Sequence, residues 1–198
     1  AGYPDVKIIA SNSLDEYIIR DLLLQGAEVD QFGVGENLIT SKSNPVFGGV
    51  YKLVAVKSGG EYTPKIKISE SLEKITTPHF KKLYRFYNRE NGKAIADYIA
   101  LHDEEVSGLN EIEIFDPIET WKRKKIENFE IRELHQLIFK EGRCVYQSPD
   151  LADIKSYCAK EVETVWDEVK RFENPHRYYV DMSQKLWNAR QKLLAEYA

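Results

Sequence analysis

The sequence predicts an α/β protein, and three features of the 198-residue chain carry that prediction. Two short apolar runs near the amino terminus, residues 6–10 and 29–34, flank an amphipathic segment, which is typical of a strand–helix–strand unit. The middle of the chain alternates β-branched and aromatic residues with glycine-containing turns, which favours β-hairpins. The last third carries amphipathic segments preceded by capping residues, which predicts helices.

The segment between the two apolar runs predicts a helix with a clear beginning and end. Ser13 and Glu16 have the spacing of a capping box, Asp15 adds negative charge to the first turn, and Gly26 supplies the stop. The apolar positions form a stripe wide enough to pack on a sheet: Leu14, Tyr17, Ile18, Leu22 and Leu24. A connection this compact requires parallel strands, so both strands end at the same edge of their sheet.

A small polar loop follows each of these two strands. The second loop, Phe32 to Thr40, reads FGVGENLIT, and residues 36–39 in it predict a short helix. Glycines without Cβ atoms let the backbone turn sharply and leave N–H groups free to point at an anion. We therefore expect a phosphate site made of Ser11, Asn12, Gly33, Val34 and Gly35, with Glu36 as a possible member. The alternative is that Gly-Val-Gly is only a tight turn.

Two hairpins are predicted in the middle of the chain. The first joins strands at residues 50–56 and 64–68 through Ser58-Gly59-Gly60, and the second joins residues 82–87 and 94–101 through Asn91-Gly92. Three lysines of the first hairpin are candidates for a basic wall beside the phosphate site: Lys52, Lys65 and Lys67. The alternative for these lysines is an ordinary solvated strand face.

The charged segment 103–108 is the best internal boundary, and further strands and helices are expected after it. Strands are predicted at residues 111–115 and 131–139, with a turn at 141–143. The basic run Trp121 to Lys125 is interpreted as a solvated surface. Ser148 and Pro149 open a helix reaching about Phe172, Asn174-Pro175 breaks it, an extended piece follows at 178–180, and Ser183 caps a final helix.

Composition excludes several classes of protein. A net charge of −4 argues against a general binder of nucleic acids or anionic membranes. No apolar run approaches the roughly 20 residues of a membrane-spanning helix. Cys144 and Cys158 do not make a disulfide framework, which favours a reducing cytoplasm, and we expect both to be buried structural cysteines rather than metal ligands.

Catalytic groups are missing from the pattern. The four histidines lie in unrelated predicted elements, so no Ser/His/Asp arrangement is legible, and no metal site is expected: His79, His102, His135 and His176. The chain starts at Ala1 without an initiator Met and runs directly into an apolar strand, which we interpret as a piece of a longer protein.

Several ordered motifs of the chain resemble nicotinate phosphoribosyltransferases. The resemblance is carried by residues 10–17 (ASNSLDEY), 32–40 (FGVGENLIT), 48–54 (GGVYKLV), 64–69 (PKIKIS), 73–76 (EKIT) and 174–181 with Ser183 (NPHRYYVD). These motifs run in order from the first strand to the last helix, so the resemblance covers essentially the whole chain.

The resemblance implies an activity and a fold. Members of the family couple nicotinate to phosphoribosyl pyrophosphate, and ATP hydrolysis with Mg²⁺ drives the reaction through a phosphohistidine. The fold is an irregular α/β barrel with flanking α/β domains, and a homodimer completes the active sites. This implies the end of the barrel with its phosphate loops at residues 1–56, a hairpin-rich segment at 57–108 and a carboxyl-terminal α/β domain at 109–198.

The chain departs from the family pattern at several positions. Ser13 stands where many members have Asp, Glu36 where many have Thr, and His79 where Gly is frequent, which we interpret as a surface substitution. The phosphorylated histidine and the nicotinate-binding residues of the family correspond to positions before Ala1. We therefore expect no catalytic residue in this chain.

Two alternatives remain open at this point. One is a related phosphoribosyltransferase that uses nicotinamide or quinolinate. The other is a non-catalytic interaction module from residue 111 onward, which exposure of its tryptophans would favour: Trp121, Trp166 and Trp187.

Overall fold

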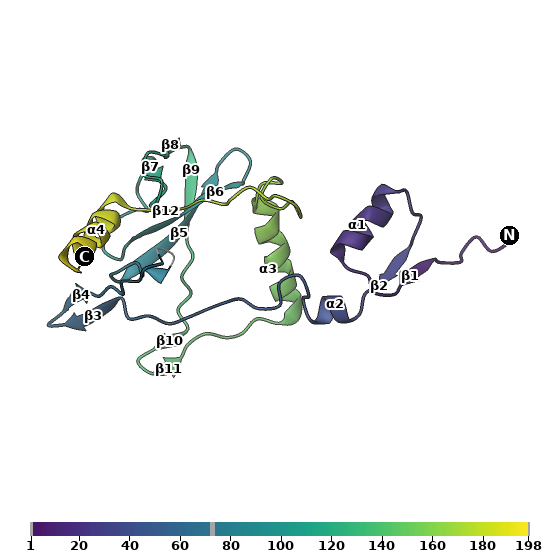
Figure 1. Ribbon diagram of the computed structural model, residues 1–198, viewed down its shortest axis with the longest axis horizontal. Helices are drawn as coiled ribbons and strands as arrows, with labels where there is room; N and C mark the ends of the chain where they lie inside the picture. The colour runs from purple at the N-terminus through teal and green to yellow at the C-terminus, as the bar shows by residue number, and fades with distance from the viewer. Residues whose placement is uncertain (1, 72–73, 198) are drawn as a thin grey trace. The chain divides into compact units, whose positions relative to one another are not determined.

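The structure, a computed structural model, describes residues 2–71 and 74–197. The chain divides into two compact units, residues 1–51 (unit 1) and residues 52–198 (unit 2). Each unit contains both strands and helices, which confirms the mixed α/β class (Figure 1).

Unit 1 is the predicted strand–helix–strand unit. Strand β1 (Ile9–Ser11) pairs in parallel with β2 (Gln31–Gly33), and helix α1 (Glu16–Leu24) connects them. The short helix α2 (Glu36–Ile39) follows, as the sequence predicts. Both strands therefore end at the same edge of this two-stranded sheet, with Ser11 opposite Gly33.

Helix α1 begins with a different cap from the predicted one. The carboxylate of Asp15 accepts hydrogen bonds from the amides of Tyr17 and Ile18, at 3.1 and 2.9 Å, so Asp15 is the N-cap. Ser13 precedes the helix with φ 50°, and the carboxylate of Glu16 accepts the hydroxyl of Ser43, so the capping-box prediction is wrong.

The end of α1 is a glycine stop, as predicted. Gly26 has φ +80°, which favours glycine because a Cβ atom is strained there. The amides of Gly26 and Ala27 donate to the carbonyls of Leu23 and Leu22, both at 3.0 Å, which is the Schellman arrangement.

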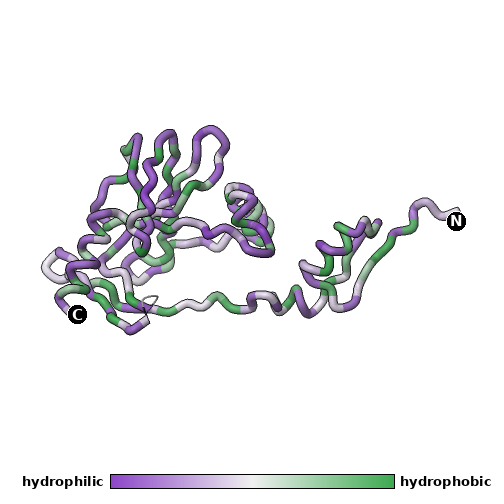
Figure 2. Tube along the Cα trace, turned by 45° about the horizontal axis from the view of Figure 1, so that its top comes forward, coloured by the Kyte–Doolittle hydropathy of each residue, from purple (hydrophilic) through white to green (hydrophobic). Residues whose placement is uncertain are grey.

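Unit 1 buries little apolar surface. Among its described residues only Leu14 and Asn37 are buried, and no residue of α1 itself is buried. Leu24 is 78% exposed and Ile39 is 84% exposed. Apolar and polar residues alternate along α1 (Figure 2), but of the predicted stripe only Leu14 is buried and Leu22 is half-buried.

Unit 2 is built on a four-stranded sheet in the order β12-β6-β5-β9. Strands β5 (Lys81–Asn88) and β6 (Ala94–Leu101) form the predicted hairpin, and Gly92 in its turn has φ +67°. Strand β9 (Phe129–Glu133) pairs antiparallel with β5, whereas β12 (Val180–Met182) pairs in parallel with β6.

One face of this sheet carries the hydrophobic core. Phe86 is fully buried and meets Tyr98 and Phe129 edge-to-face, with ring centroids 5.6 and 4.9 Å apart. The hairpin of β7 (Glu111–Phe115) and β8 (Arg123–Glu127) adds Ile114 and Ile126 to the same cluster. Alternation of side chains along each strand separates this apolar face from a charged one.

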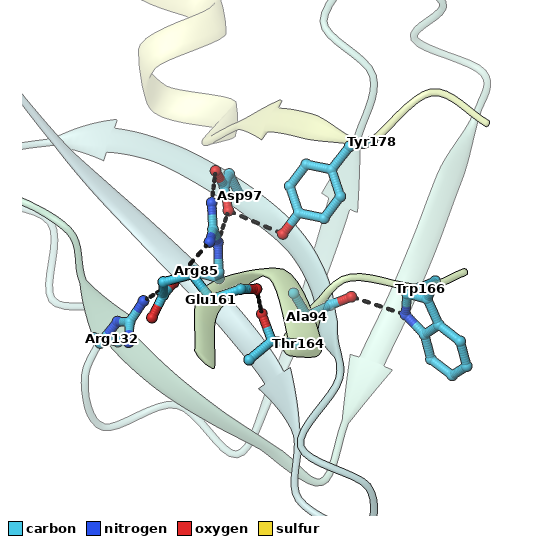
Figure 3. A network of polar contacts seen from close by, with 8 residues as sticks. All are labelled: Arg85, Ala94, Asp97, Arg132, Glu161, Thr164, Trp166 and Tyr178. Carbon is cyan, nitrogen blue, oxygen red and sulfur yellow. Dashed lines mark hydrogen bonds and ion pairs between the residues drawn. The ribbon is translucent and has the colours of Figure 1, made fainter. Parts of the chain in front are cut away.

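The charged face holds the helix α3 (Leu151–Thr164). Arg85 binds Asp97 through two nitrogens, at 2.7 and 3.0 Å, and its third nitrogen donates to Glu161 of α3 at 3.2 Å (Figure 3). Glu161 also accepts from Arg132 at 2.6 Å. No residue of α3 is buried, so ionic contacts rather than apolar packing tie it to the sheet.

Several predicted boundaries in unit 2 are corrected. Residues 50–54 lie outside any strand, and the first hairpin is formed by β3 (Ala55–Ser58) and β4 (Glu61–Pro64). The predicted strand 131–139 is split between β9 and β10 (Phe139–Lys140), which pairs with β11 (Arg143–Cys144). Of the predicted extended piece at 178–180, only Val180 belongs to a strand.

The two carboxyl-terminal helices differ in how well they were predicted. Asp150, not Ser148, is the N-cap of α3, and the helix ends at Thr164 rather than near Phe172. Ser183 caps α4 (Gln184–Tyr197) as predicted, because its hydroxyl accepts the amide of Leu186 at 3.1 Å.

The divisions expected after residues 56 and 108 differ from those in the structure. The units separate after residue 51, and the four-stranded sheet includes strands from both sides of residue 108. Among the described residues, no helix has the length and hydrophobicity needed to cross a membrane.

Candidate functional site

The carboxyl ends of β1 and β2 and the start of α2 surround a pocket of about 330 Å³ in unit 1. Three of the five residues predicted for the phosphate site line it, together with four others: Asn12, Gly33, Gly35, Ser13, Leu14, Glu36 and Asn37. Ser11 and Val34 are not lining residues, but they lie next to lining residues in the chain. The structure therefore brings the two predicted loops to one place.

Glycine suits position 33 because β1 and β2 approach so closely there that a side chain has little room. A Cβ atom built on Gly33 lies 3.3 Å from the Cβ of Ser11, which is tighter than ordinary van der Waals contact. Gly35 differs, since φ is −105° and an added Cβ meets nothing within 4 Å. A side chain at Gly35 would thus project into open space.

Asn37 joins the two loops of the pocket. Its side-chain amide donates to the carbonyls of Ser13 and Leu14, at 3.3 and 2.9 Å, and the residue is only 8% exposed. Asn12 and Ser13 both have positive φ, 89° and 50°, so this bond holds a turn that the backbone does not favour by itself. Sequence reasoning missed Asn37, although an amide directly after a glycine loop was a signal for it.

The charge around the pocket is negative rather than positive. Glu36 is the first residue of α2, and no Lys or Arg is among the lining residues. The first amide donor within α2 is that of Leu38, so the amides of Glu36 and Asn37 have no acceptor inside the helix. An anion in this pocket would depend on backbone N–H groups and neutral side chains.

The three candidate lysines belong to unit 2, whereas the residues that line the pocket belong to unit 1. Lys65 and Lys67 are exposed while Ile66 between them is half-buried, which fits the alternation expected of them. Lys52 precedes β3 and is also exposed. Their role at the phosphate site stays a prediction.

A turn in the family-like segment is held by a lysine that sequence reasoning also missed. The Lys81 ammonium donates to the carbonyls of Thr77, Pro78 and His79, at 2.7, 3.2 and 2.7 Å. Burial lowers the pKa of Lys81 to about 8, so it remains mostly charged near neutral pH. His79 has φ +73° and is half-buried, so the substitution lies in the turn and not simply on the surface.

The carboxyl-terminal motif is anchored on the charged face of the sheet. The Tyr178 hydroxyl donates to Asp97 at 3.0 Å, and the Arg85 guanidinium lies 5.6 Å from the Tyr178 ring (Figure 3). Hydrogen bonding to Asp97 raises the pKa of Arg85, so the guanidinium stays charged. The motif therefore has a structural role on the sheet.

Other sequence expectations have mixed outcomes. Cys144 and Cys158 are both exposed, so the expectation of buried cysteines is wrong. Trp121 is 73% exposed and Trp166 is 42% exposed, whereas Trp187 is half-buried and donates to the carbonyl of Pro117. Within the described ranges, no group of three or more His, Cys, Asp or Glu has the arrangement of a metal site.

Comparison with known proteins places the chain among enzymes of one kind. The family model described as nicotinate phosphoribosyltransferase C-terminal domain matches residues 80–190. Nicotinate phosphoribosyltransferase of Bacillus subtilis is 42% identical over 196 residues, which cover 99% of this chain and 40% of that protein. The enzyme of the same name from Caenorhabditis elegans is 36% identical over 93% of this chain and 32% of its own length.

The fold agrees with these sequence matches. The crystal structure of human nicotinic acid phosphoribosyltransferase superposes with a TM-score of 0.72 at 25% identity, covering 96% of this chain and 33% of the human chain. The chain thus spans well under half the length of the relatives it matches. Because the family model covers more than half of its residues, the chain belongs to the nicotinate phosphoribosyltransferase family.

Proposed function

We propose that this chain is the carboxyl-terminal part of an enzyme that joins nicotinate to phosphoribosyl pyrophosphate in NAD salvage. The products are nicotinate mononucleotide and pyrophosphate. The observation that carries the proposal is the pocket between the ends of β1 and β2, built by two family-like loops. Relatives that bear the name nicotinate phosphoribosyltransferase match nearly the whole chain, which supports it.

In this proposal the pocket of unit 1 receives the 5′-phosphate of the phosphoribosyl group. The carboxyl edge of parallel strands followed by a helix start is a frequent seat for phosphate, because unpaired amides point outward there. Ser11, Asn12 and the Gly33-to-Gly35 loop would supply these donors. Asn37 would keep the two loops at a fixed separation, so that the donors need no rearrangement when the ligand arrives.

The remaining chemistry is assigned to parts of the enzyme outside this chain. The proposal includes ATP and Mg²⁺ as cosubstrate and metal, a homodimer, and a cytoplasmic location. The described residues do not fit a metal site, so we derive no step through Mg²⁺ here. No residue of this chain is proposed to be catalytic.

A base-selection assay on the intact protein tests the proposal. With phosphoribosyl pyrophosphate and ATP present, nicotinate should give its mononucleotide much faster than nicotinamide or quinolinate gives the corresponding nucleotide. Chromatographic separation of the three mononucleotides measures this directly. Faster turnover of either of the other two bases would assign the chain to a related phosphoribosyltransferase instead.

A further inference from the structure

The basic run of β8 contains cations with different surroundings. Arg123 pairs with Glu113, and Lys125 pairs with Glu111 at 2.6 Å. Lys124 lies between them in the strand, and its side chain is exposed. The cross-strand partner of Lys124 is Ile114, not a carboxylate. In the described part of the chain no ion pair neutralises Lys124.

Lys124 lines a cavity of about 980 Å³ that lies wholly within unit 2. Ile114 and Ile126 form part of its apolar wall, and Trp166 and Tyr178 are among its aromatic residues. Both aromatic side chains are held in place, because Trp166 donates to the carbonyl of Ala94 at 2.9 Å and Tyr178 donates to Asp97 (Figure 3). The cavity therefore has rigid aromatic surfaces.

Asp181 of β12 also lines this cavity, and it is the unusual residue in it. It is only 4% exposed, and no hydrogen bond or ion pair of its carboxyl group is found among the described residues. The neighbouring Asp116 does have partners. Its carboxylate accepts hydrogen bonds from two backbone amides and lies 3.6 Å from the guanidinium of Arg177.

An unpartnered buried carboxyl group is costly to keep. Burial and repulsion by Asp116 raise the pKa of Asp181 to about 6, against an opposing effect of Arg177, so most of it is ionised at neutral pH. A fold retains such a group when a ligand completes its hydrogen bonds, and perturbed acids in cavities are frequent at binding sites. The acceptor capacity of Asp181 is directed to the cavity that it lines.

We propose that this cavity binds a purine nucleotide whose base carries an amino group, with Asp181 accepting the N–H groups of the base and Lys124 pairing with the phosphate. The unpaired anion and the unpaired cation require a ligand with donors at one end and negative charge at the other. The aromatic residues suit a planar base. A cavity of this volume fits a nucleotide better than an amino acid.

Guanine is the base that suits Asp181 best. A carboxylate has two acceptor oxygens, and guanine presents two adjacent donors, N1–H and the N2 amino group. Adenine and hypoxanthine each offer a single donor on that edge. GMP should therefore bind more tightly than AMP or IMP. The cavity is lined by residues of unit 2 and the phosphate pocket by residues of unit 1, so this inference does not depend on the proposed function.

Calorimetric titration of the 198-residue chain at pH 7.5 provides the test. We expect GMP to bind, IMP to bind about tenfold more weakly, and inorganic phosphate to bind at least a hundredfold more weakly, since a lost charged hydrogen bond costs about one to two decades of affinity. Absence of GMP binding at millimolar concentration, or equal affinity for GMP and phosphate, would overturn the proposal.

Matched variants locate the site. Lys124→Met should weaken GMP binding about tenfold, whereas Lys155→Met, at an exposed lysine of α3 that does not line the cavity, should leave it unchanged. Asp181→Asn should weaken GMP binding tenfold or more while bringing its affinity closer to that of IMP. Equal effects of the two lysine variants, or unchanged binding by Asp181→Asn, would place any nucleotide elsewhere and contradict the proposal.

Discussion

The open space beside the backbone of Gly35 allows a direct test of the phosphate pocket, because a side chain added there would occupy the pocket. Gly35→Val should place its side chain in the pocket, because no atom lies within 4 Å of an added Cβ. Loss of two charge-assisted bonds of roughly 1.5–3 kcal/mol each predicts a Michaelis constant for phosphoribosyl pyrophosphate raised about a hundredfold or more.

Steady-state kinetics of the intact enzyme measure this effect, and Gly48→Val is the matched control. Gly48 also has open space around an added Cβ, but it does not line the pocket. Ser11→Ala should raise the same constant more mildly. A folded Gly35 variant with a normal Michaelis constant would show that the loop is only a turn.

Asn37 gives a second prediction at the scale of one residue. Asn37→Ala leaves the carbonyls of Ser13 and Leu14 without their donor. The free energy of unfolding should fall by about 1–3 kcal/mol, and phosphate binding should weaken because the turn loses its support. Asn37→Asp should behave similarly at pH 7.5 and recover binding as the pH falls, since a protonated carboxyl group can donate. A pH-independent Asn37→Asp variant would argue against this positioning role.

The ionisation of Asp181 predicts how stability changes with pH. Because the folded chain raises this pKa from 3.8 to about 6, the folded state binds the proton more tightly than the unfolded chain does. The contribution of this group to the free energy of unfolding therefore falls as the pH rises from about 4 to about 6. Asp181→Asn should be more stable than the parent at pH 7 by on the order of 2 kcal/mol, with the difference vanishing near pH 4. Urea denaturation at both pH values measures it, and a less stable variant at pH 7 would contradict the argument.

Helix α3 shows what ionic anchoring means for a whole element. With no buried residue of its own, it depends on Glu161, which binds Arg85 and Arg132. Glu161→Ala should speed hydrogen exchange of the α3 amides about tenfold or more while the amides of β5 and β6 change little. Glu163→Ala is the control, since among the described residues the hydrogen bond found for Glu163 is to its backbone carbonyl, which the substitution keeps. Equal exchange in the two variants would mean that other contacts hold the helix.

Elements also show how far the sequence could predict the structure. The parallel pairing of β1 and β2 was predictable because a short strand–helix–strand connection leaves no other topology. The helix caps were not predictable, because serine and aspartate both cap well. The sequence places Ser13 close to Asp15 and Ser148 close to Asp150, and in each case the aspartate is the cap. Residues 50–54 have strand-forming side chains but no partner strand, and propensity alone does not supply one.

The candidate site was predicted in part for a similar reason. Glycines and small polar residues that directly follow a strand can be recognised in the sequence. Asn12, Gly33 and Gly35 could therefore be predicted, and all three line the pocket. The contribution of Asn37 depends on contacts with residues 24 and 23 positions away, which do not follow from local pattern. The contacts of Lys81 are local, with carbonyls two to four positions before it. That Ile114 and not a carboxylate lies opposite Lys124 required the register of β7 and β8.

For the whole molecule, exposed apolar residues predict how the chain behaves alone. Phe47 is 97% exposed, Val50 81% and Ile39 84%. The isolated chain should therefore self-associate, which light scattering at increasing concentration measures. A clean monomer at high concentration would contradict this expectation.

Because the proposed function assigns the catalytic residues to other parts of the enzyme, it predicts that this chain alone is inactive. Since none of its residues is assigned to catalysis, the 198-residue protein should form no nicotinate mononucleotide above a control without enzyme. A coupled NAD assay with nicotinate, phosphoribosyl pyrophosphate and ATP is sensitive enough to test it. Measurable turnover would place catalytic groups within this chain.

The parallel pairing of β12 with β6 has a consequence for synthesis of the protein. Val180 pairs with Asp97, so about 80 residues separate the two strands in the sequence. At a translation rate of about 5–20 residues per second, the edge of β6 waits on the order of ten seconds for its partner. The growing chain therefore exposes an open sheet edge until β12 has emerged from the ribosome, and this interval is when binding by a chaperone would matter most.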